Sequence, residues 1–302
     1  MIDIGAGGPF RVSARARVAI ALAASALAAS ALGACGSSSS SSGAGGGSGS
    51  GTAAAGPHSR PAPRRVPALA LPPNPRPRSV RVPILTYHRV HVYATELTKS
   101  TPDLTVEPTV FAAEVAALDR RGYHAIGQGQ LYAALFEGRP LPPKPVLISV
   151  DDGYVDGLKE ILPVLRRHHM VATFYIITGR FHEPGFLTAG QVRQLDGAGM
   201  DIGAHTRTHV SLPALSGAAL TSQVAGSRRD LERVLGHPVD YFAYPYGAVD
   251  ANVIASVRRA GFVLAVTTQG GTRESSLAPL TMPRIHVGRA MTPASVLAAV
   301  AG

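Results

Sequence analysis

The sequence predicts an α/β domain with the fold of a distorted (β/α)7-type barrel, preceded by a disordered N-terminal tether. Two observations support this fold class. Short continuous apolar runs alternate with amphipathic segments over residues 83–302, a pattern typical of a parallel sheet covered by helices. Polar residues directly follow three of the apolar runs, at the strand ends where (β/α) barrels place their functional residues. An open parallel sheet is the alternative.

The elements of this domain follow from apolar periodicity and capping residues. Phe111, Val115 and Leu118 stand at i, i+4 and i+7, the spacing of one helix face. Thr188 and Gln191 form the pattern of a capping box. We expect strands at residues 82–86, 146–150, 171–177, 201–204, 241–243 and 262–267, and helices at 111–122, 158–165, 188–199, 216–235 and 250–261.

Residues 1–35 have the pattern of an export signal. Three arginines at positions 11–17 precede an uncharged apolar run over residues 18–34, which is shorter than the roughly 20 residues of a membrane-spanning helix. The ending Leu-Gly-Ala-Cys at 32–35 resembles the lipobox of bacterial lipoproteins. We therefore expect a lipoprotein signal peptide, with Cys35 as lipid anchor and the protein outside the cytoplasm; a plain signal peptide or an uncleaved anchor is the alternative. Cys35 is the only cysteine, so no intrachain disulfide can form.

Residues 36–82 predict a disordered linker, Ser/Gly-rich at first and Pro/Arg-rich from residue 57. Residues 1–82 also hold nine arginines against the single acid Asp3, out of a whole-chain net charge of +10. The domain at 83–302 is left with a net charge of +2, which is too small to indicate binding to DNA or RNA. We expect a monomer with no nucleic-acid partner.

Two carboxylates stand side by side where the predicted strand 146–150 ends. Asp151 and Asp152 repel each other unless a cation or a donor takes up their charge. If one of them binds a metal ion, the other can serve as a general base. Taken alone, Asp-Asp-Gly is also an ordinary turn sequence.

His205 and His209 directly follow the predicted strand 201–204. Two histidines four residues apart can face one ion, and with one carboxylate they form a His2Asp set with open coordination positions. We therefore expect Asp152, His205 and His209 to hold a divalent metal, most simply Zn²⁺. The same ligand set also suits Fe(II) in an oxygenase.

Several motifs together resemble those of the polysaccharide deacetylases, carbohydrate esterase family 4, which share the NodB-homology domain. The segments Ser-Val-Asp-Asp-Gly-Tyr at 149–154 and His-Thr-Arg-Thr-His at 205–209 are similar to its first two motifs. Phe-Ala-Tyr-Pro-Tyr-Gly at 242–247 and Ile-Leu-Thr-Tyr-His-Arg-Val at 84–90 resemble segments of the poly-N-acetylglucosamine deacetylase branch. The resemblance covers residues 83–287, and its motifs occur in the family's order.

The resemblance implies an activity and a role for each matching residue. Asp152, His205 and His209 would bind zinc, and Asp151 would be the general base. Tyr246, through its backbone N–H, and the preceding Pro245 would form the substrate and oxyanion side. The activity would be metal-dependent N-deacetylation of N-acetylglucosamine units in an extracellular or cell-wall polysaccharide, with release of acetate.

The chain departs from the commoner family pattern in three places. Tyr244 stands near the position of an arginine that orients the base, and Arg284 is a candidate replacement. The chain contains no tryptophan, so a motif built around that residue is absent. The final Leu-x-x-His motif is not evident; His88 is our first choice for the catalytic acid and His286 the second. An O-acetyl esterase of xylan type and a non-catalytic sugar-binding lipoprotein remain alternatives.

Overall fold

A computed structural model describes residues 68–93 and 102–302. The expected signal peptide, Cys35 and most of the expected linker lie outside these residues. Within the described ranges, no helix combines the length and apolarity that a membrane span requires.

The core of the domain is a curled parallel sheet. In the described part of the chain, seven strands pair in the order β10, β9, β8, β7, β6, β2 and β12, each pairing parallel, and β5 adds to β6. The strands are β2 (Ile84–Tyr87), β5 (His124–Ala125), β6 (Pro145–Val150), β7 (Thr173–Ile176), β8 (Asp201–Ala204), β9 (Tyr241–Ala243), β10 (Leu264–Val266) and β12 (Ile285–His286). The two smaller sheets consist of β1 (Ser79–Arg81) with β11 (Arg273–Ser275) and β3 (Arg89–Val90) with β4 (Thr105–Val106).

The segment before β12 links the two ends of this strand order. Val266 in β10 forms a parallel bridge with Met282. The Met282 N–H donates to the Ala265 carbonyl and its carbonyl accepts from the Thr267 N–H, both at 2.9 Å. The sheet therefore curls into a distorted (β/α)7-type barrel, as the sequence predicted.

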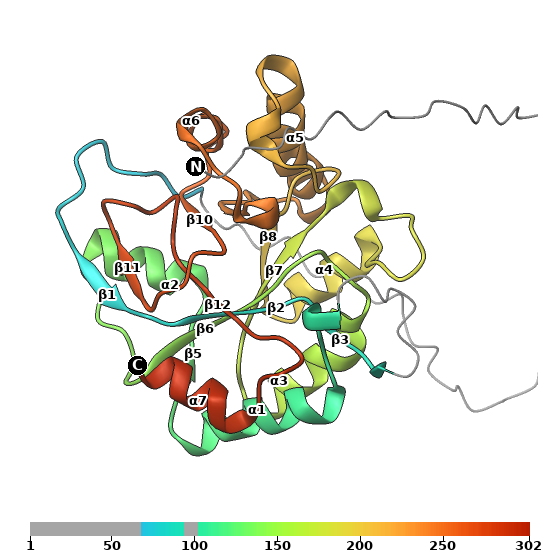
Figure 1. Cartoon of the computed structure of the whole chain (residues 1–302). Helices are drawn as coiled ribbons and strands as arrows, with labels where there is room; N and C mark the ends of the chain where they lie inside the picture. The colour runs from blue at the N-terminus through green and yellow to red at the C-terminus, as the bar shows by residue number, and fades with distance from the viewer. Residues whose placement is uncertain (1–67, 94–101) are drawn as a thin grey trace, which may run out of the picture. The chain divides into compact units, whose positions relative to one another are not determined.

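Helices surround the strands (Figure 1). They are α1 (Pro108–Arg120), α2 (Gln128–Tyr132), α3 (Leu162–Arg167), α4 (Ala189–Gly197), α5 (Gly217–Leu235), α6 (Ala251–Arg259) and α7 (Pro293–Ala301). Short helical turns are η2 (Pro102–Leu104), η3 (Ala133–Glu137), η4 (Gly157–Ile161), η5 (Thr178–Arg180), η6 (Leu212–Ala214) and η7 (Pro245–Gly247). The predicted helix 158–165 is divided, because its first turn is the π-helix η4 and only its second part is α-helical.

Local signals in the sequence set several helix ends. The Thr188 hydroxyl accepts from the Gln191 N–H at 3.3 Å, and the Gln191 side chain accepts from the Thr188 N–H at 2.8 Å. This is the predicted capping box of α4. Asp250 caps α6 by accepting from the Val253 N–H at 2.8 Å. Gly236 ends α5 at φ +80°, a left-handed conformation that glycine adopts without steric cost.

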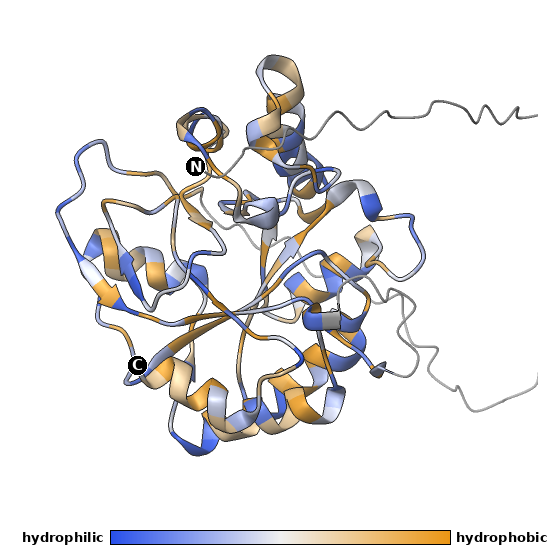
Figure 2. Cartoon of the chain, viewed as in Figure 1, coloured by the Kyte–Doolittle hydropathy of each residue, from blue (hydrophilic) through white to orange (hydrophobic). Residues whose placement is uncertain are grey.

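Two apolar cores lie on opposite sides of the strands, since successive side chains of a strand point to opposite faces. On β7, Phe174 and Ile176 belong to the core shared with the helices, whereas Tyr175 belongs to the core inside the barrel. Apolar residues accordingly predominate along the central strands in Figure 2. The two cores hold the strand ends in fixed relative positions, and those ends carry the polar residues of the candidate site.

Residues 68–82 differ from the expected linker because they pack on the domain. β1 pairs antiparallel with β11. The Leu69 N–H donates to an Asp240 carboxylate oxygen at 3.1 Å, and the Tyr132 hydroxyl donates to the Ala70 carbonyl at 2.5 Å. Leu69 and Leu71 also pack against the inner core. We call residues 68–82 the strap; its Pro-rich composition concealed these apolar anchors.

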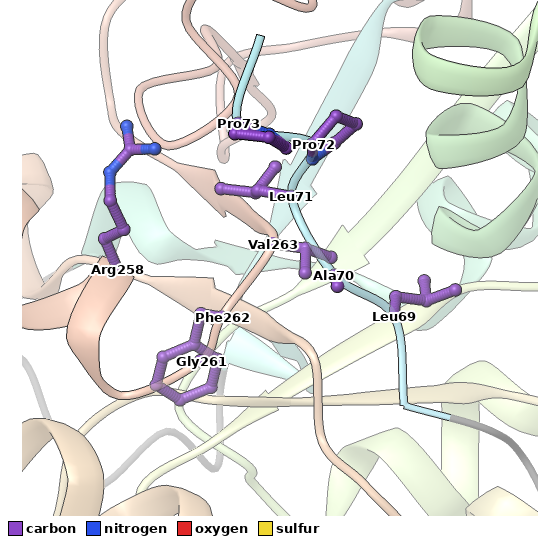
Figure 3. Close-up of a pocket in the computed structure, with 9 residues that line it drawn as sticks. All are labelled: Leu69, Ala70, Leu71, Pro72, Pro73, Arg258, Gly261, Phe262 and Val263. Carbon is purple, nitrogen blue, oxygen red and sulfur yellow. The ribbon is translucent and has the colours of Figure 1, made fainter. Parts of the chain in front are cut away.

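The strap borders a pocket of about 390 Å³ together with residues that precede β10 (Figure 3). Leu71, Pro72 and Pro73 lie across from Phe262 and Val263 in that view. Since β10 begins at residue 264, this contact is at the N-terminal end of the strand, away from the end that carries the candidate site. We therefore expect the strap to stabilise the barrel rather than to take part in the candidate site.

Removing the strap is expected to destabilise the domain. A chain that starts at residue 83 loses the β1–β11 pairing and the contacts of Leu69 and Leu71. We expect a loss of roughly 3 kcal/mol compared with a chain that starts at residue 68, or a fall in Tm of about 6–12 °C. Thermal unfolding of the two chains measures the difference, and equal Tm values would contradict this role.

Candidate metal centre

Three potential ligands converge where β6 and β8 end. Asp152 follows β6, and His205 and His209 follow β8. The Nε2 atoms of both histidines lie 3.5 Å from Oδ1 of Asp152, and the three ligand atoms lie within 4.8 Å of one another. A tetrahedral ion with ligands at about 2.1 Å places its ligand atoms roughly 3.4 Å apart. The observed spacing therefore fits one metal ion.

Hydrogen bonds to the other ring nitrogens fix both imidazoles. Nδ1 of His205 lies 2.8 Å from the Ala243 carbonyl, which can only accept, so this nitrogen carries the proton. Nδ1 of His209 lies 3.2 Å from the Tyr246 hydroxyl, which can accept its proton or donate to it. The Nε2 lone pair of His205 is thus left to point towards Asp152, and that of His209 is too when its Nδ1 donates to Tyr246. Partners of this kind fix the tautomer and orientation of metal-binding histidines.

The chemical state of these groups also suits a cation. Oδ1 of Asp152 is buried and has no hydrogen-bond partner among the described residues. Burial, and next the charge of Asp151, raise the pKa of Asp152 to about 7. Burial lowers the pKa of His205 and of His209 to about 4, so both rings are neutral near pH 7. Neutral imidazoles beside an unpartnered carboxylate are a donor set that a divalent cation would satisfy.

The second carboxylate, Asp151, has a different environment. Arg284 donates to both of its oxygens, at 2.8 and 2.7 Å, and also to the Thr267 carbonyl and the Ser149 hydroxyl. Burial alone would raise the pKa of Asp151, but the charge and hydrogen bonds of Arg284 hold it well below its usual range. Asp151 is therefore ionised and rigidly oriented beside the candidate metal ligands.

His88 lies on the other side of Asp151. Its Nε2 is 4.0 Å from Oδ2 of Asp151, and its Nδ1 is buried with no hydrogen-bond partner in the described ranges. Burial lowers the pKa of His88 to about 4. The exposed ring of His286 lies 5.8 Å from that of His88, and its Nε2 is 3.3 Å from the Asp103 carbonyl. Of the two candidate acids, His88 is therefore the one that lies next to Asp151.

Tyr246 lies on the turn η7, which follows β9 and borders the histidines. Its ring packs against His209 with centroids 4.6 Å apart, and 65 % of its surface is exposed. The next residue, Gly247, has φ +67°, and a Cβ there would lie 2.1 Å from the Thr268 hydroxyl oxygen. Only glycine fits this close approach. Pro245 is buried within the same turn.

Backbone strain is concentrated in this region. Of the six non-glycine residues with positive φ in the described part of the chain, four belong to the site: Asp152, Thr206, His209 and Tyr246. Such conformations are costly and persist only where the surrounding structure imposes them. They tend to cluster at functional sites, and here two of the four, Asp152 and His209, are candidate metal ligands.

The sequence did not reveal several contacts of the site. We expected only the backbone N–H of Tyr246 to act, yet its hydroxyl also approaches His209. The group that orients His205 is the backbone carbonyl of Ala243, and a backbone group cannot be recognised from the residue type. The charge of Arg180 offsets part of the burial-driven rise in the pKa of Asp152 and adds to the burial-driven fall in the pKa of His209. Its position in the loop after β7 offered no motif by which to find it.

Comparisons with known proteins match the same region of the chain. The family model described as "Polysaccharide deacetylase" matches residues 138–265. "Putative polysaccharide deacetylase YxkH" of Bacillus subtilis (strain 168) is 25% identical over 215 residues, which cover 71% of this chain and 74% of that protein. "Peptidoglycan-N-acetylglucosamine deacetylase" of Bacillus cereus is 24% identical over 158 residues, covering 52% of this chain and 56% of that protein.

A solved structure shares the fold. The Streptococcus pyogenes deacetylase PplD, determined in complex with acetate, superposes with a TM-score of 0.69 at 27% sequence identity. The match covers 74% of this chain and 99% of that one. The family model, the relatives and the shared fold agree with the converging ligands and the Arg-held carboxylate. The chain therefore contains a polysaccharide deacetylase domain, the domain of a family of enzymes that hydrolyse amide bonds of acetylated polysaccharides.

Proposed function

We propose that the protein is a zinc-dependent N-deacetylase that removes acetyl groups from N-acetylglucosamine units of an extracellular or cell-wall polysaccharide. The observation that carries this proposal is the arrangement of two carboxylates with opposite environments. Oδ1 of Asp152 has no hydrogen-bond partner in the described part of the chain and lies beside two neutral histidines, whereas Asp151 is held ionised by Arg284. The first arrangement suits a metal ligand and the second a general base.

The proposed reaction assigns each proton to a side chain. Asp152, His205 and His209 would hold the zinc ion, which would supply an acidified water and a Lewis acid for the acetamide carbonyl. Asp151 accepts the proton of the attacking water through the oxygen that faces His88. The backbone N–H of Tyr246, beside Pro245, donates to the tetrahedral oxyanion. Arg284 keeps Asp151 ionised and oriented before the proton arrives.

His88 completes this scheme as the acid. Because its pKa is lowered to about 4, the resting ring is neutral and carries no spare proton. The proton that reaches the leaving amine must therefore come from the water, by way of Asp151 and then His88. The 4.0 Å between Nε2 of His88 and Oδ2 of Asp151 is short enough for a small shift to bring the two into hydrogen-bond contact.

Replacing His88 by alanine is expected to lower kcat by about 10²–10⁴-fold, because the amine leaves poorly without a proton. His286→Ala is the matched control, as the exposed ring of His286 lies beyond His88; we expect kcat within a few-fold of wild type. Steady-state acetate release measures both. A His88→Ala enzyme within a few-fold of wild type would contradict the assignment.

The proposed substrate class is supported by a relative, the peptidoglycan-N-acetylglucosamine deacetylase of Bacillus cereus. The segment 84–90, with its histidine ahead of the aspartate pair, favours the poly-N-acetylglucosamine branch. Acetate release from a panel of poly-N-acetylglucosamine, chitin oligomers, peptidoglycan and acetylxylan tests the class. We expect release from the N-acetylated glucosamine polymers; release from acetylxylan alone would contradict N-deacetylation.

We also propose that the enzyme acts outside the cytoplasm, attached to the membrane by a lipid on Cys35. Support comes from the apolar run at 18–34 and its Leu-Gly-Ala-Cys ending. In a bacterial host we expect Cys35→Ser to move the protein from the membrane to the soluble fraction and to remove the lipid mass. Mass spectrometry of the membrane fraction measures this change. Unchanged fractionation and mass would contradict the anchor.

A further inference from the structure

Helix α5 contributes no metal ligand, yet it contacts the loop that carries both histidines. Oε1 of Gln223 accepts from the N–H groups of Arg207 and Thr208, at 3.0 and 3.1 Å. Nε2 of Gln223 donates back to the Thr208 hydroxyl at 2.8 Å. One side chain of α5 thus binds the middle of residues 205–209, which we call the histidine loop.

A second contact ties the same loop to α5. The Arg207 guanidinium donates to both carboxylate oxygens of Asp230, at 2.7 and 2.9 Å, and to the Ser222 hydroxyl at 3.2 Å. The Thr178 hydroxyl also donates to Asp230, at 3.2 Å. Asp230 therefore joins the histidine loop, α5 and the turn η5 at one carboxylate. A two-pronged Arg–carboxylate pair fixes direction as well as distance.

The shape of α5 is adapted to this contact. Gly226 is buried in the middle of the 19-residue helix, where glycine is unfavourable relative to alanine. A Cβ at Gly226 would lie 2.7 Å from the Arg207 guanidinium, so alanine would displace that side chain. The glycine thus leaves the space in which Arg207 lies along the helix.

The loop requires external support because its backbone is strained. Thr206 and His209 have φ values of +64° and +55°, a region that residues with a Cβ rarely adopt. The Thr206 hydroxyl accepts from the His209 N–H at 3.0 Å, so the loop satisfies one of its own donors. The N–H groups of Arg207 and Thr208 depend on Gln223 instead.

From these contacts we infer that Gln223, Asp230 and Gly226 of α5 are positioning residues that set the metal affinity of the site. They act through the loop, by holding His209 in the strained conformation that aims its Nε2 at Asp152. This inference rests on the proposed metal-binding function. Replacing residues that orient metal ligands in this way commonly lowers metal affinity by about 10- to 100-fold.

The test measures zinc affinity directly, by competition of the metal-free protein with a chromophoric chelator. We expect Gln223→Ala to weaken zinc binding about 10- to 100-fold. Gln223→Glu keeps an acceptor for both N–H groups and is expected to stay within a few-fold of wild type. Arg229→Ala, an exposed position of the same helix, is the control and is expected to bind zinc as wild type does.

Gly226→Ala separates positioning from general helix stability. Alanine favours the helix but displaces Arg207 from Asp230, so we expect weaker zinc binding and a smaller rise of Tm on adding zinc. Zinc affinities of Gln223→Ala and Gly226→Ala within twofold of wild type would overturn the inference. A wild-type protein that binds no zinc would instead contradict the proposed metal site itself.

Discussion

Replacing Asp151 by asparagine is expected to lower kcat/KM for acetate release by about 10²–10⁴-fold while zinc binding is retained. The amide cannot accept the proton of the attacking water, and the loss of a positioned base is of this order. The candidate ligands Asp152, His205 and His209 are left in place. Acetate release and metal content, measured on the same preparation, check the two parts of the expectation.

The same change is expected to destabilise the fold. Arg284 is 3 % exposed and both of its terminal nitrogens bond to Asp151, so an asparagine leaves a buried cation without its counter-ion. The cost of breaking such a pair is about 3–5 kcal/mol. The double variant Asp151→Asn with Arg284→Met removes both charges; we expect it to recover much of the stability and none of the activity. Recovered activity would show that Asp151 is not the base.

Replacing Asp152 by asparagine is expected to abolish tight zinc binding and to lower acetate release by at least about 10³-fold. The variant loses the proposed charged ligand around which the two histidines are arranged, and the water that the metal would acidify would be lost with it. Metal analysis after dialysis measures the first effect. A variant that keeps stoichiometric zinc would show that the carboxylate is not a ligand.

The same substitution, Asp152→Asn, is not expected to lower the stability of the metal-free protein. Burial raises the pKa of Asp152 to about 7, above its value in the unfolded chain. The folded state therefore binds the proton more tightly, and this contribution to stability is full at low pH and is lost as the pH rises through 7. We expect Asp152→Asn to be at least as stable as the metal-free wild type at pH 8. Thermal unfolding in chelator at pH 5 and pH 8 gives the comparison.

Much of the fold could be predicted because its signals are local. The run 146–150 corresponds to β6, Thr188 and Gln191 form the expected capping box, and Gly236 ends α5. The packing of the strap on the domain could not be predicted. Leu69 and Leu71 contact residues that lie far away in the sequence, and only folding brings them together. Proline-rich composition describes an isolated segment and says nothing of a surface on which that segment packs.

The candidate ligands could also be predicted from the sequence, because their signals are local. His205 and His209 lie four residues apart, and Asp152 adjoins a strand. Arg284 could only be named as a candidate partner of Asp151, since 133 residues separate the two and only folding shows their contact. The contacts of Gln223 and Asp230 with the histidine loop have no motif, because a helix residue acquires such a role only through its tertiary partner.

The most direct test of the account is acetate release from an N-acetylated glucosamine oligomer by the metal-free enzyme as zinc is added back. We expect almost no release after chelation and full recovery at one zinc ion per chain. We also expect no recovery for Asp152→Asn at the same zinc concentration. Undiminished release by enzyme shown to contain no metal would contradict the central claim that Asp152, His205 and His209 hold the ion on which the reaction depends.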